Sequence, residues 1–155
     1  MAERTAGTAE LPTAEDTIAL GAELGRQLRA GDVVVLSGPL GAGKTVLAKG
    51  IAQALDVDGP VISPTFVLAR VHRARRPGAP EMIHVDLYRL LDHASVDLLA
   101  ELDSLDLDTD LEDAVVVVEW GEGLAERLSD NHLDVRLERA SDTEVRTAVW
   151  NWSTP

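Results

Sequence analysis

The sequence predicts a three-layer α/β domain built on a mixed β-sheet, and three features support this prediction. Two short apolar runs, residues 33–36 and 114–118, have the length and composition of buried parallel strands. Segments with helical spacing of small and apolar residues precede the first run and follow the glycine-rich stretch behind it. Near the C-terminus, residues 133–137 and 145–150 alternate between apolar and polar side chains, which predicts a closing antiparallel hairpin.

Composition and charge restrict the class of protein. The chain has 155 residues, enough for one domain with a buried core, and it has no cysteine, which excludes disulfides and thiolate metal sites. Its longest apolar run is far shorter than the ~20 residues of a membrane helix, and its first residues lack the apolar core of a signal peptide. We therefore expect a soluble, cytoplasmic protein with no membrane partner. The net charge of −13 repels phosphate, so we expect that this chain alone does not bind RNA or DNA.

The expected elements follow each other along the chain. Residues 1–10 are small and polar and are predicted to form a disordered tail before a single domain at 11–155. Thr13 has the position of a helix cap, and the helix behind it is expected to pack one face closely through small residues and to end at Gly31. The further predicted elements are a helix at 44–55, antiparallel strands at 66–72 and 81–87 joined by a loose turn, and an acidic helix at 94–113.

The segment Gly-Pro-Leu-Gly-Ala-Gly-Lys-Thr at 38–45 matches the pattern of a phosphate-binding loop at every required position. Its glycines allow the backbone amides to turn inward and form a nest for a β-phosphate, and the helix that follows places its positive end against the same oxygens. Lys44 is expected to bridge the β- and γ-phosphates, and the Thr45 hydroxyl is expected to ligate magnesium. The segment therefore predicts a nucleotide site.

Three further side chains are candidates for the metal side of this site. Asp86 ends one apolar strand and Glu119 ends another, and a carboxylate at the C-terminal edge of a sheet suits magnesium. Their positions leave open which of them binds the metal, since either is otherwise a solvated strand end. Thr65, in Ser-Pro-Thr-Phe, is either a switch-type contact to the γ-phosphate and magnesium or part of an ordinary turn.

Four segments together resemble one known family. The stretches GPLGAGKT, SPTF, HVDLYRL and VVVVEWGE, in this order and at these distances, resemble the TsaE family, the small ATPases of bacterial tRNA threonylcarbamoyladenosine synthesis. The resemblance covers about residues 11 to 140. It implies a P-loop NTPase fold with a mainly parallel sheet extended by antiparallel strands, and it implies ATP as the nucleotide together with Mg²⁺.

The resemblance also implies roles for individual residues and partners. Thr45 and Glu119 would bind magnesium, Asp86 would lie beside the γ-phosphate and the attacking water, and catalysis would rest on Lys44, Asp86 and Glu119. The residues implied in ATP binding are Gly41, Ala42, Gly43, Lys44, Thr45, Val46, Thr65, Asp86 and Trp120. Members of the family act with two partner proteins that form the transferase, reach tRNA through that complex for modification at position 37, and are thought to reset it by hydrolysing ATP. This chain departs from the family pattern at Val46, where a second threonine is common, and near His72, where a tyrosine is usual.

Two questions stay open at the level of sequence. A basic cluster on the predicted turn is either a solvated tip or a contact for a partner, for tRNA or for the γ-phosphate, and it consists of Arg70, Arg73, Arg75 and Arg76. The rival functions are a small-molecule kinase and an adaptor that binds ATP without cleaving it. A kinase would transfer phosphate to a metabolite, whereas an adaptor would release no ADP when its partners are present.

Overall fold

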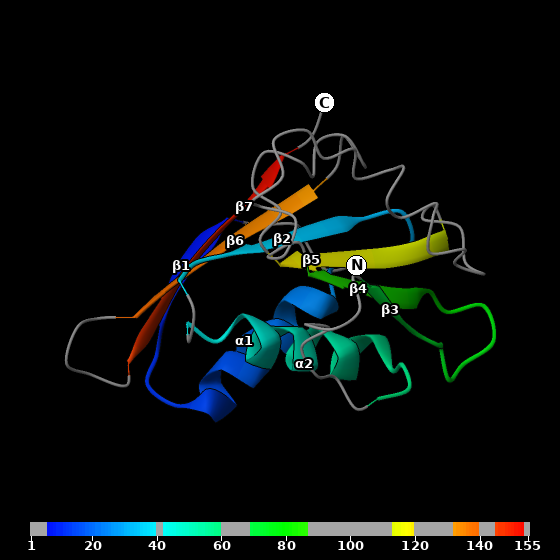
Figure 1. Cartoon of the computed structure of the whole chain (residues 1–155), viewed down its shortest axis with the longest axis horizontal. Helices are drawn as coiled ribbons and strands as arrows, with labels where there is room; N and C mark the ends of the chain where they lie inside the picture. Colours follow the sequence, from blue (N-terminus) through cyan, green and yellow to red (C-terminus); the bar gives the residue numbers. More distant parts are fainter. Residues whose placement is uncertain are drawn as a thin grey trace.

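The computed structural model of the chain describes residues 6–39, 42–59, 69–86, 113–119, 132–139 and 145–153. Within this part of the chain, seven strands form one sheet and two helices cover one of its faces (Figure 1). The elements are β1 (Gly7–Leu11), α1 (Ala14–Gly25), β2 (Val33–Ser37), α2 (Lys44–Leu55), β3 (Ala69–His72), β4 (Glu81–Asp86), β5 (Ala114–Glu119), β6 (His132–Arg139) and β7 (Arg146–Ser153). The predicted helix at 94–113 and the second helical layer that it would supply lie outside the described residues.

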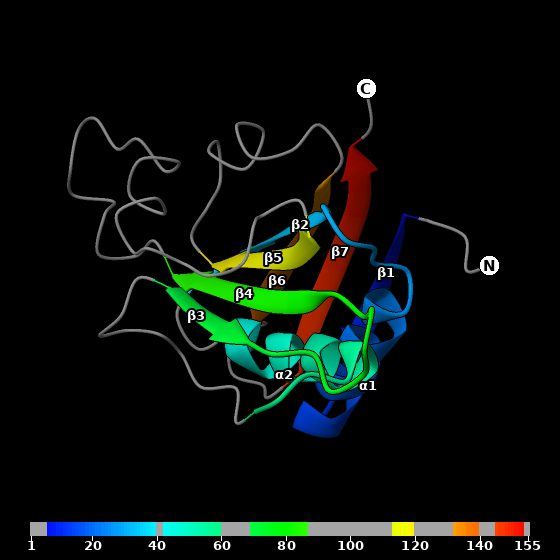
Figure 2. The ribbon, with the colours of Figure 1, turned by 90° about the vertical axis from the view of Figure 1, so that its right-hand side faces the viewer.

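The sheet is parallel in its centre and antiparallel at both margins. Its strand order is β1-β7-β6-β2-β5-β4-β3, with β6, β2, β5 and β4 parallel to their neighbours in this group (Figure 2). Antiparallel pairs then add β7 and β1 at one margin and β3 at the other. This arrangement confirms the predicted mixed α/β fold of the P-loop NTPase type, and the β6–β7 pair confirms the predicted closing hairpin.

The register of the central strands places three side-chain positions in one row. Glu119 at the end of β5 pairs with Leu36 on β2 and with Asp86 on β4. Because these strands are parallel, their C-terminal ends meet at the same edge of the sheet, where ligands bind in folds of this class. The sequence prediction that both carboxylates end strands at this edge is therefore confirmed.

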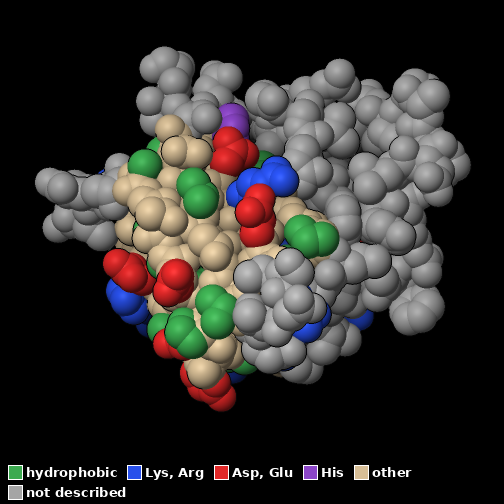
Figure 3. Space-filling view, turned by 90° about the vertical axis from the view of Figure 1, so that its left-hand side faces the viewer, with side chains coloured by type: hydrophobic (Ala, Val, Ile, Leu, Met, Phe, Trp, Pro, Cys, Tyr) green, Lys and Arg blue, Asp and Glu red, His purple; other side chains and the backbone are tan. Residues whose placement is uncertain are grey.

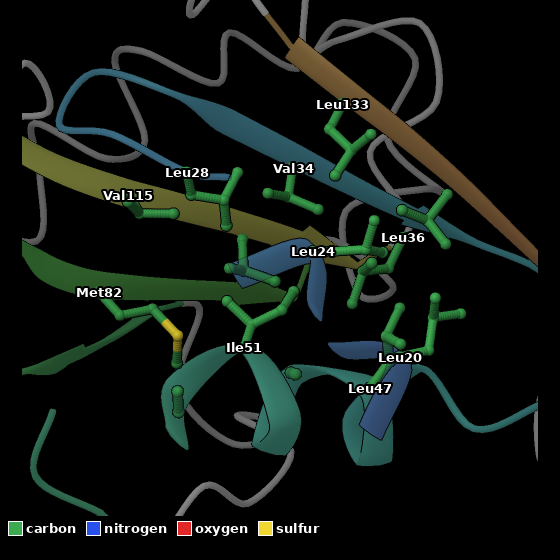
Figure 4. Close-up of a cluster of buried hydrophobic side chains, with 14 of the residues drawn as sticks. Leu20, Leu24, Leu28, Val34, Leu36, Leu47, Ile51, Met82, Val115 and Leu133 are labelled. Carbon is green, nitrogen blue, oxygen red and sulfur yellow. The ribbon is translucent and has the colours of Figure 1, made fainter. Parts of the chain in front are cut away.

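The described core lies between the sheet and the two helices (Figure 4). The largest side chains in it are buried leucines, an isoleucine and a methionine, and they include Leu24, Leu36, Leu47, Ile51, Met82 and Leu133. Valines of the opposite sheet face, such as Val116 and Val118, are buried as well. Burial on both faces explains why these strands are continuous apolar runs in the sequence. None of the described helices is long and apolar enough to cross a membrane.

Helix α1 begins as predicted and ends earlier than predicted. The Thr13 hydroxyl accepts a hydrogen bond from the Asp16 amide at 3.2 Å, and the Asp16 carboxylate accepts one from the Thr13 amide at 3.0 Å, so the capping box is complete. The helix ends at Gly25 and not at Gly31. Beyond Gly25 the backbone hydrogen bonds join residues three apart, and this tighter turn places Leu28 in the core. Gly31, with φ of 92°, then directs the chain into β2.

The predicted disordered tail is wrong for residues 7–10, which belong to the edge strand β1. This strand pairs with β7 in a register that joins Gly7 to Trp150 and Leu11 to Arg146. Backbone pairing needs no apolar side chains, so the polar composition of this stretch concealed a strand. Leu11 is 3 % exposed and anchors its inner end, while Gly7 lies directly against the Trp150 ring.

The connection between β3 and β4 is docked onto the end of α2, whereas the sequence predicted a loose turn. A bridge joins Val57 to Ala74, and the Asp58 amide donates to the Arg73 carbonyl at 2.8 Å. The side chains of the connection form ion pairs with acidic residues, namely Arg73 with Glu81, Arg75 with Asp56 and Asp58, and Arg76 with Asp56. Arg73, Arg75 and Arg76 are therefore attached to neighbouring acidic residues and do not form a loose tip, although their side chains remain exposed to solvent.

The face beyond β1 has a mixed surface. Figure 3 shows acidic and basic side chains of the described residues among separate small hydrophobic areas on this face. Val149, on β7, is the exposed large hydrophobic residue of the described chain, at 44 %. The arrangement is that of an ordinary solvated sheet margin.

Candidate functional site

The loop between β2 and α2 has the backbone of an anion-binding turn. Gly38 and Gly43 have φ of 137° and 102°, in the region that L side chains rarely adopt. A Cβ on Gly38 would also lie 2.2 Å from the Leu137 carbonyl oxygen, so no other residue fits there. Gly43 is the N-cap of α2 and makes no side-chain cap, which leaves the first amides of the helix directed at the space in front of the loop.

Lys44 has its ammonium group within this loop. The residue is 6 % exposed, and its Nζ donates to the Gly38 carbonyl at 2.6 Å and to the Pro39 carbonyl at 3.2 Å. These carbonyls hold the long side chain folded back over the loop. The cation is thus kept beside the amides of the α2 N-terminus, where both favour the same negatively charged ligand.

Thr45, Glu119 and His84 form a chain of contacts at the edge of the sheet. The Thr45 hydroxyl lies 3.3 Å and 3.2 Å from the Oε1 and Oε2 atoms of Glu119. The His84 Nε2 atom lies 2.6 Å from Glu119 Oε2. Glu119 is 3 % exposed and its neighbour Asp86 is 7 % exposed. Two carboxylates at the sheet edge and a hydroxyl at the start of α2 therefore lie close together.

These oxygens fit the needs of a magnesium ion. Magnesium prefers hard oxygen ligands, and proteins bind it through one or two carboxylates together with substrate phosphates and waters. The Thr45 hydroxyl and the Glu119 carboxylate supply such a set beside a phosphate-binding loop. Within the described ranges, no group of three or more His, Cys, Asp or Glu residues has the geometry of a metal site.

A pocket of about 170 Å³ adjoins the loop on the side of α1. It lies where the start of α1, the start of α2 and the first residue of β7 meet. Its lining consists of Pro12, Thr13, Ala14, Thr17, Gly43, Val46 and Arg146. Because Gly43 and Val46 belong to the loop and to the first turn of α2, a ligand held by the loop can extend into this pocket.

The structure brings together most of the residues that the sequence singled out. Those placed at the loop, at the first turn of α2 or at the adjoining sheet edge are Ala42, Gly43, Lys44, Thr45, Val46, Asp86 and Glu119. Three of the predicted ATP contacts lie outside the described residues, namely Gly41, Thr65 and Trp120.

Two parts of the site were missed at the level of sequence. For His84, packing was the alternative to a role in the site, and no contact with Glu119 was predicted, although His84 stands two positions before Asp86 and so shares a strand face with it. Thr13 was recognised only as a helix cap, and Arg146 was not singled out, yet both line the pocket. Thr13 and Arg146 lie at opposite ends of the chain, so no local sequence pattern indicated that they line the same pocket.

Comparison with known proteins gives consistent results. A sequence model described as "Threonylcarbamoyl adenosine biosynthesis protein TsaE" matches residues 11–148. A protein named "tRNA threonylcarbamoyladenosine biosynthesis protein TsaE" from Mycobacterium tuberculosis is 77 % identical over 146 residues, covering 94 % of this chain and 87 % of the relative. A protein of the same name from Streptomyces coelicolor is 52 % identical over 130 residues, covering 82 % and 84 %. The crystal structure of Bacillus subtilis YdiB, at 23 % identity, matches with a TM-score of 0.70 over 100 % of this chain and 90 % of that one, which supports the fold.

Proposed function

The chain belongs to the TsaE family, and on this premise we propose that it binds ATP with Mg²⁺, hydrolyses it, and serves the synthesis of threonylcarbamoyladenosine in tRNA. The observation that carries the proposal is the contact between the Thr45 hydroxyl and both oxygens of Glu119, at 3.2 and 3.3 Å. It joins the phosphate-binding loop to the sheet edge through two oxygen ligands of the kind that magnesium needs.

The phosphates of ATP bind at the β2–α2 loop in this proposal. The uncapped amides at the start of α2 donate to the phosphate oxygens, and the Lys44 ammonium adds a charge-assisted bond to the β- and γ-phosphates. The pocket beside Gly43 and Val46 takes the nucleoside, and Arg146 forms part of its lining. Alanine in place of Lys44 removes the ammonium group from the loop.

Cleavage of ATP depends on the carboxylates at the sheet edge. Thr45 and Glu119 would hold the magnesium ion, and the ion would supply positive charge to neutralise the transferring phosphoryl group. Asp86 stands beside Glu119 in register and is almost buried, so its carboxylate can accept a hydrogen bond from a water aligned with the γ-phosphate. The burial of both acids keeps bulk water away and strengthens these interactions.

The activity serves a larger assembly in this proposal. The chain acts in the cytoplasm with the two proteins that form the transferase, and its ATP hydrolysis resets their complex between rounds of modification. A net charge of −13 favours contact with tRNA through these partners and not through this chain alone.

The proposal is tested by calorimetric titration of the chain with ATP, with and without Mg²⁺, and by ADP release in the presence of the two partners. We expect wild-type binding that tightens with Mg²⁺, ADP release that rises with the partners, and loss of binding in Lys44→Ala. Absence of ATP binding by the wild-type chain would refute the nucleotide site. Binding without ADP release in the full assembly would favour the adaptor function instead.

A further inference from the structure

His84 is completely buried on β4 and points its imidazole at the carboxylate that ends β5. It is 0 % exposed, and its Nε2 atom lies 2.6 Å from Glu119 Oε2. It pairs in register with Val117, two residues before Glu119 on the neighbouring strand. The imidazole therefore lies behind the carboxylate, on the side away from the sheet edge where Asp86 and Glu119 end their strands.

Among the residues that the structure describes, the other ring nitrogen of His84 has no hydrogen-bond partner. Its Nδ1 atom is buried and unsatisfied, which in a protein interior costs about 1–3 kcal/mol for a polar group. A carboxylate oxygen accepts in this contact, so the Nε2 atom of His84 carries the proton and donates to Glu119. Packing alone does not account for this residue, because a leucine or methionine would fill the space without burying an unpaired nitrogen.

The two oxygens of Glu119 are thereby made unequal. Oε2 accepts the short bond from His84, while both oxygens lie within reach of the Thr45 hydroxyl. A carboxylate fixed at one oxygen by a donor behind it presents its other oxygen in a fixed direction. The same relationship between a ligand and a hydrogen-bonding group behind it tunes metal sites in general.

We propose that His84 is a positioning residue, which holds the Glu119 carboxylate in the orientation that binds magnesium. The inference rests on the proposed function, because it concerns the same metal. His84 contacts neither metal nor nucleotide directly in this arrangement, and its effect passes entirely through Glu119. Its removal should leave the phosphate loop intact and weaken the dependence of nucleotide binding on Mg²⁺.

The test is a set of Mg²⁺ titrations of ATP binding, made with a fluorescent ATP analogue. In His84→Leu, we expect the Mg²⁺ concentration for half-maximal tightening to rise about tenfold or more, as for other residues behind a metal ligand. The affinity measured without metal should stay close to the wild-type value. His84→Gln carries an amide donor at a similar distance from the backbone and should recover most of the Mg²⁺ response.

His132→Leu is the matched control, because this histidine is also buried, at 8 % exposure, and pairs with Val33 at the opposite end of β2. His132→Leu also replaces a buried imidazole by leucine, but the Mg²⁺ titration of ATP binding should stay the same as in the wild-type chain. An unchanged Mg²⁺ titration in His84→Leu would overturn the proposal, and so would an equal loss of metal-free affinity, which would indicate a structural role. A wild-type chain that binds no nucleotide would refute the proposed function first.

A spectroscopic measurement tests the contact without nucleotide and covers the case in which His84→Leu fails to fold. In ¹⁵N-labelled protein, an imidazole N–H proton held in a short bond to a carboxylate should give a downfield, slowly exchanging signal. The signal should vanish in His84→Gln and shift in Glu119→Gln, and it should persist in His132→Leu. If the position of this N–H signal is the same in Glu119→Gln as in the wild-type chain, His84 does not hold this carboxylate.

Discussion

Gly21 of α1 and Gly50 of α2 lie in direct backbone contact. A Cβ atom on Gly50 would lie 2.9 Å from the Gly21 Cα and 2.1 Å from the Ile18 carbonyl oxygen, and a Cβ on Gly21 would lie 2.3 Å from the Leu47 carbonyl oxygen. The atoms in the way belong to the backbone, so no change of side-chain rotamer can relieve the contact. The two helices must therefore pack at this distance, and the start of α2, with its phosphate loop, is held by α1.

Gly50→Ala should accordingly destabilise the protein, although alanine favours a helix by about 1 kcal/mol over glycine. Overpacking of this kind typically costs about 1–3 kcal/mol, and displacement of α2 should weaken ATP binding as well. Urea unfolding and nucleotide titration measure the two effects. Lys49→Ala, at an exposed position of the same helix, is the control and should change stability by no more than about 0.5 kcal/mol. A stabilised Gly50→Ala protein would contradict the close packing of the helices.

Thr45→Ala removes one of the two oxygen ligands proposed for magnesium. We expect ATP binding in the presence of Mg²⁺ to weaken by about tenfold or more, while binding without metal changes little, since the loop amides and Lys44 remain. Thr45→Ser keeps the hydroxyl and should behave like the wild-type chain. Equal losses with and without Mg²⁺ would mean that the hydroxyl binds phosphate and not metal.

His72 should make stability depend on pH. Burial lowers its pKa below the ordinary value of 6.5, with Arg70 and His84 adding to the decrease and the hydrogen bond from Nδ1 to the Asp58 carbonyl opposing it. In the range between the lowered pKa and 6.5, the unfolded chain therefore binds more protons than the folded one. The free energy of unfolding should fall as pH decreases below about 6.5 and should be unaffected by this residue at higher pH.

The measurement for His72 is urea unfolding at several pH values between about 8 and 5, on either side of the ordinary histidine pKa. His72→Asn keeps an amide donor near the position of Nδ1 but cannot be protonated. It should show a smaller decrease of stability at acid pH than the wild-type chain. Parallel pH curves for the two proteins would show that His72 titrates alike in the folded and unfolded states.

Arg75 bonds the β3–β4 connection to the end of α2, but its contribution to stability should be small. Its side chain is 57 % exposed and pairs with Asp58 at 3.0 Å and with Asp56 at 3.7 Å. Exposed pairs contribute about 0–1 kcal/mol and are screened by salt. Arg75→Ser should lower the unfolding free energy by about 1 kcal/mol or less at low salt, with no loss at high salt and no change in ATP affinity.

Arg136→Ser is the control for Arg75, because Arg136 is similarly exposed but pairs with Glu138 on its own strand. It should have a smaller effect, since it joins no separate segments. A loss in Arg75→Ser that persists in high salt would mean that packing, not charge, holds the connection. Contact of this basic cluster with a partner protein or with tRNA stays a prediction for the assembled complex.

The parts of the fold that the sequence predicted are those with a local signal. Continuous valine runs gave β2 and β5, the Thr13 cap gave the start of α1, and the glycines of the loop gave the phosphate site. β1 was missed because its partner β7 lies at the other end of the chain, and edge pairing through the backbone leaves no pattern in the side chains.

The candidate site divides in the same way. Lys44, Thr45, Asp86 and Glu119 belong to contiguous patterns with a known chemical use, and strand register brings the last two together. The bond from His84 to Glu119 needs two strands that are 35 residues apart in sequence to lie side by side. The ion pairs of Asp56 and Asp58 with arginines of the β3–β4 connection likewise depend on how the chain returns to the end of α2. Contacts of this kind follow from tertiary structure alone.

Glu119→Gln tests whether hydrolysis, and not merely binding, is what the nucleotide provides. The substitution keeps the size of the side chain and removes the charge beside Thr45 and His84. ATP should still bind through the loop amides and through Lys44, whose Nζ atom is held by the carbonyls of Gly38 and Pro39. Cleavage should fall by ~10² or more, the usual loss when charge stabilisation at the reacting group is removed. Glu138→Gln, which removes the same charge at an exposed position of β6, should leave binding and cleavage unchanged.

The decisive measurement for Glu119→Gln is modified tRNA per assembled complex over time, with ATP cleavage followed in the same reaction. If hydrolysis resets the partner proteins, the variant should support about one round of modification and then stop, because nucleotide remains bound and the assembly cannot reopen. The wild-type chain and Glu138→Gln should continue through many rounds. Steady modification by Glu119→Gln without ATP cleavage would show instead that bound ATP acts only as a structural clamp, and the carboxylate at the end of β5 would then serve binding alone.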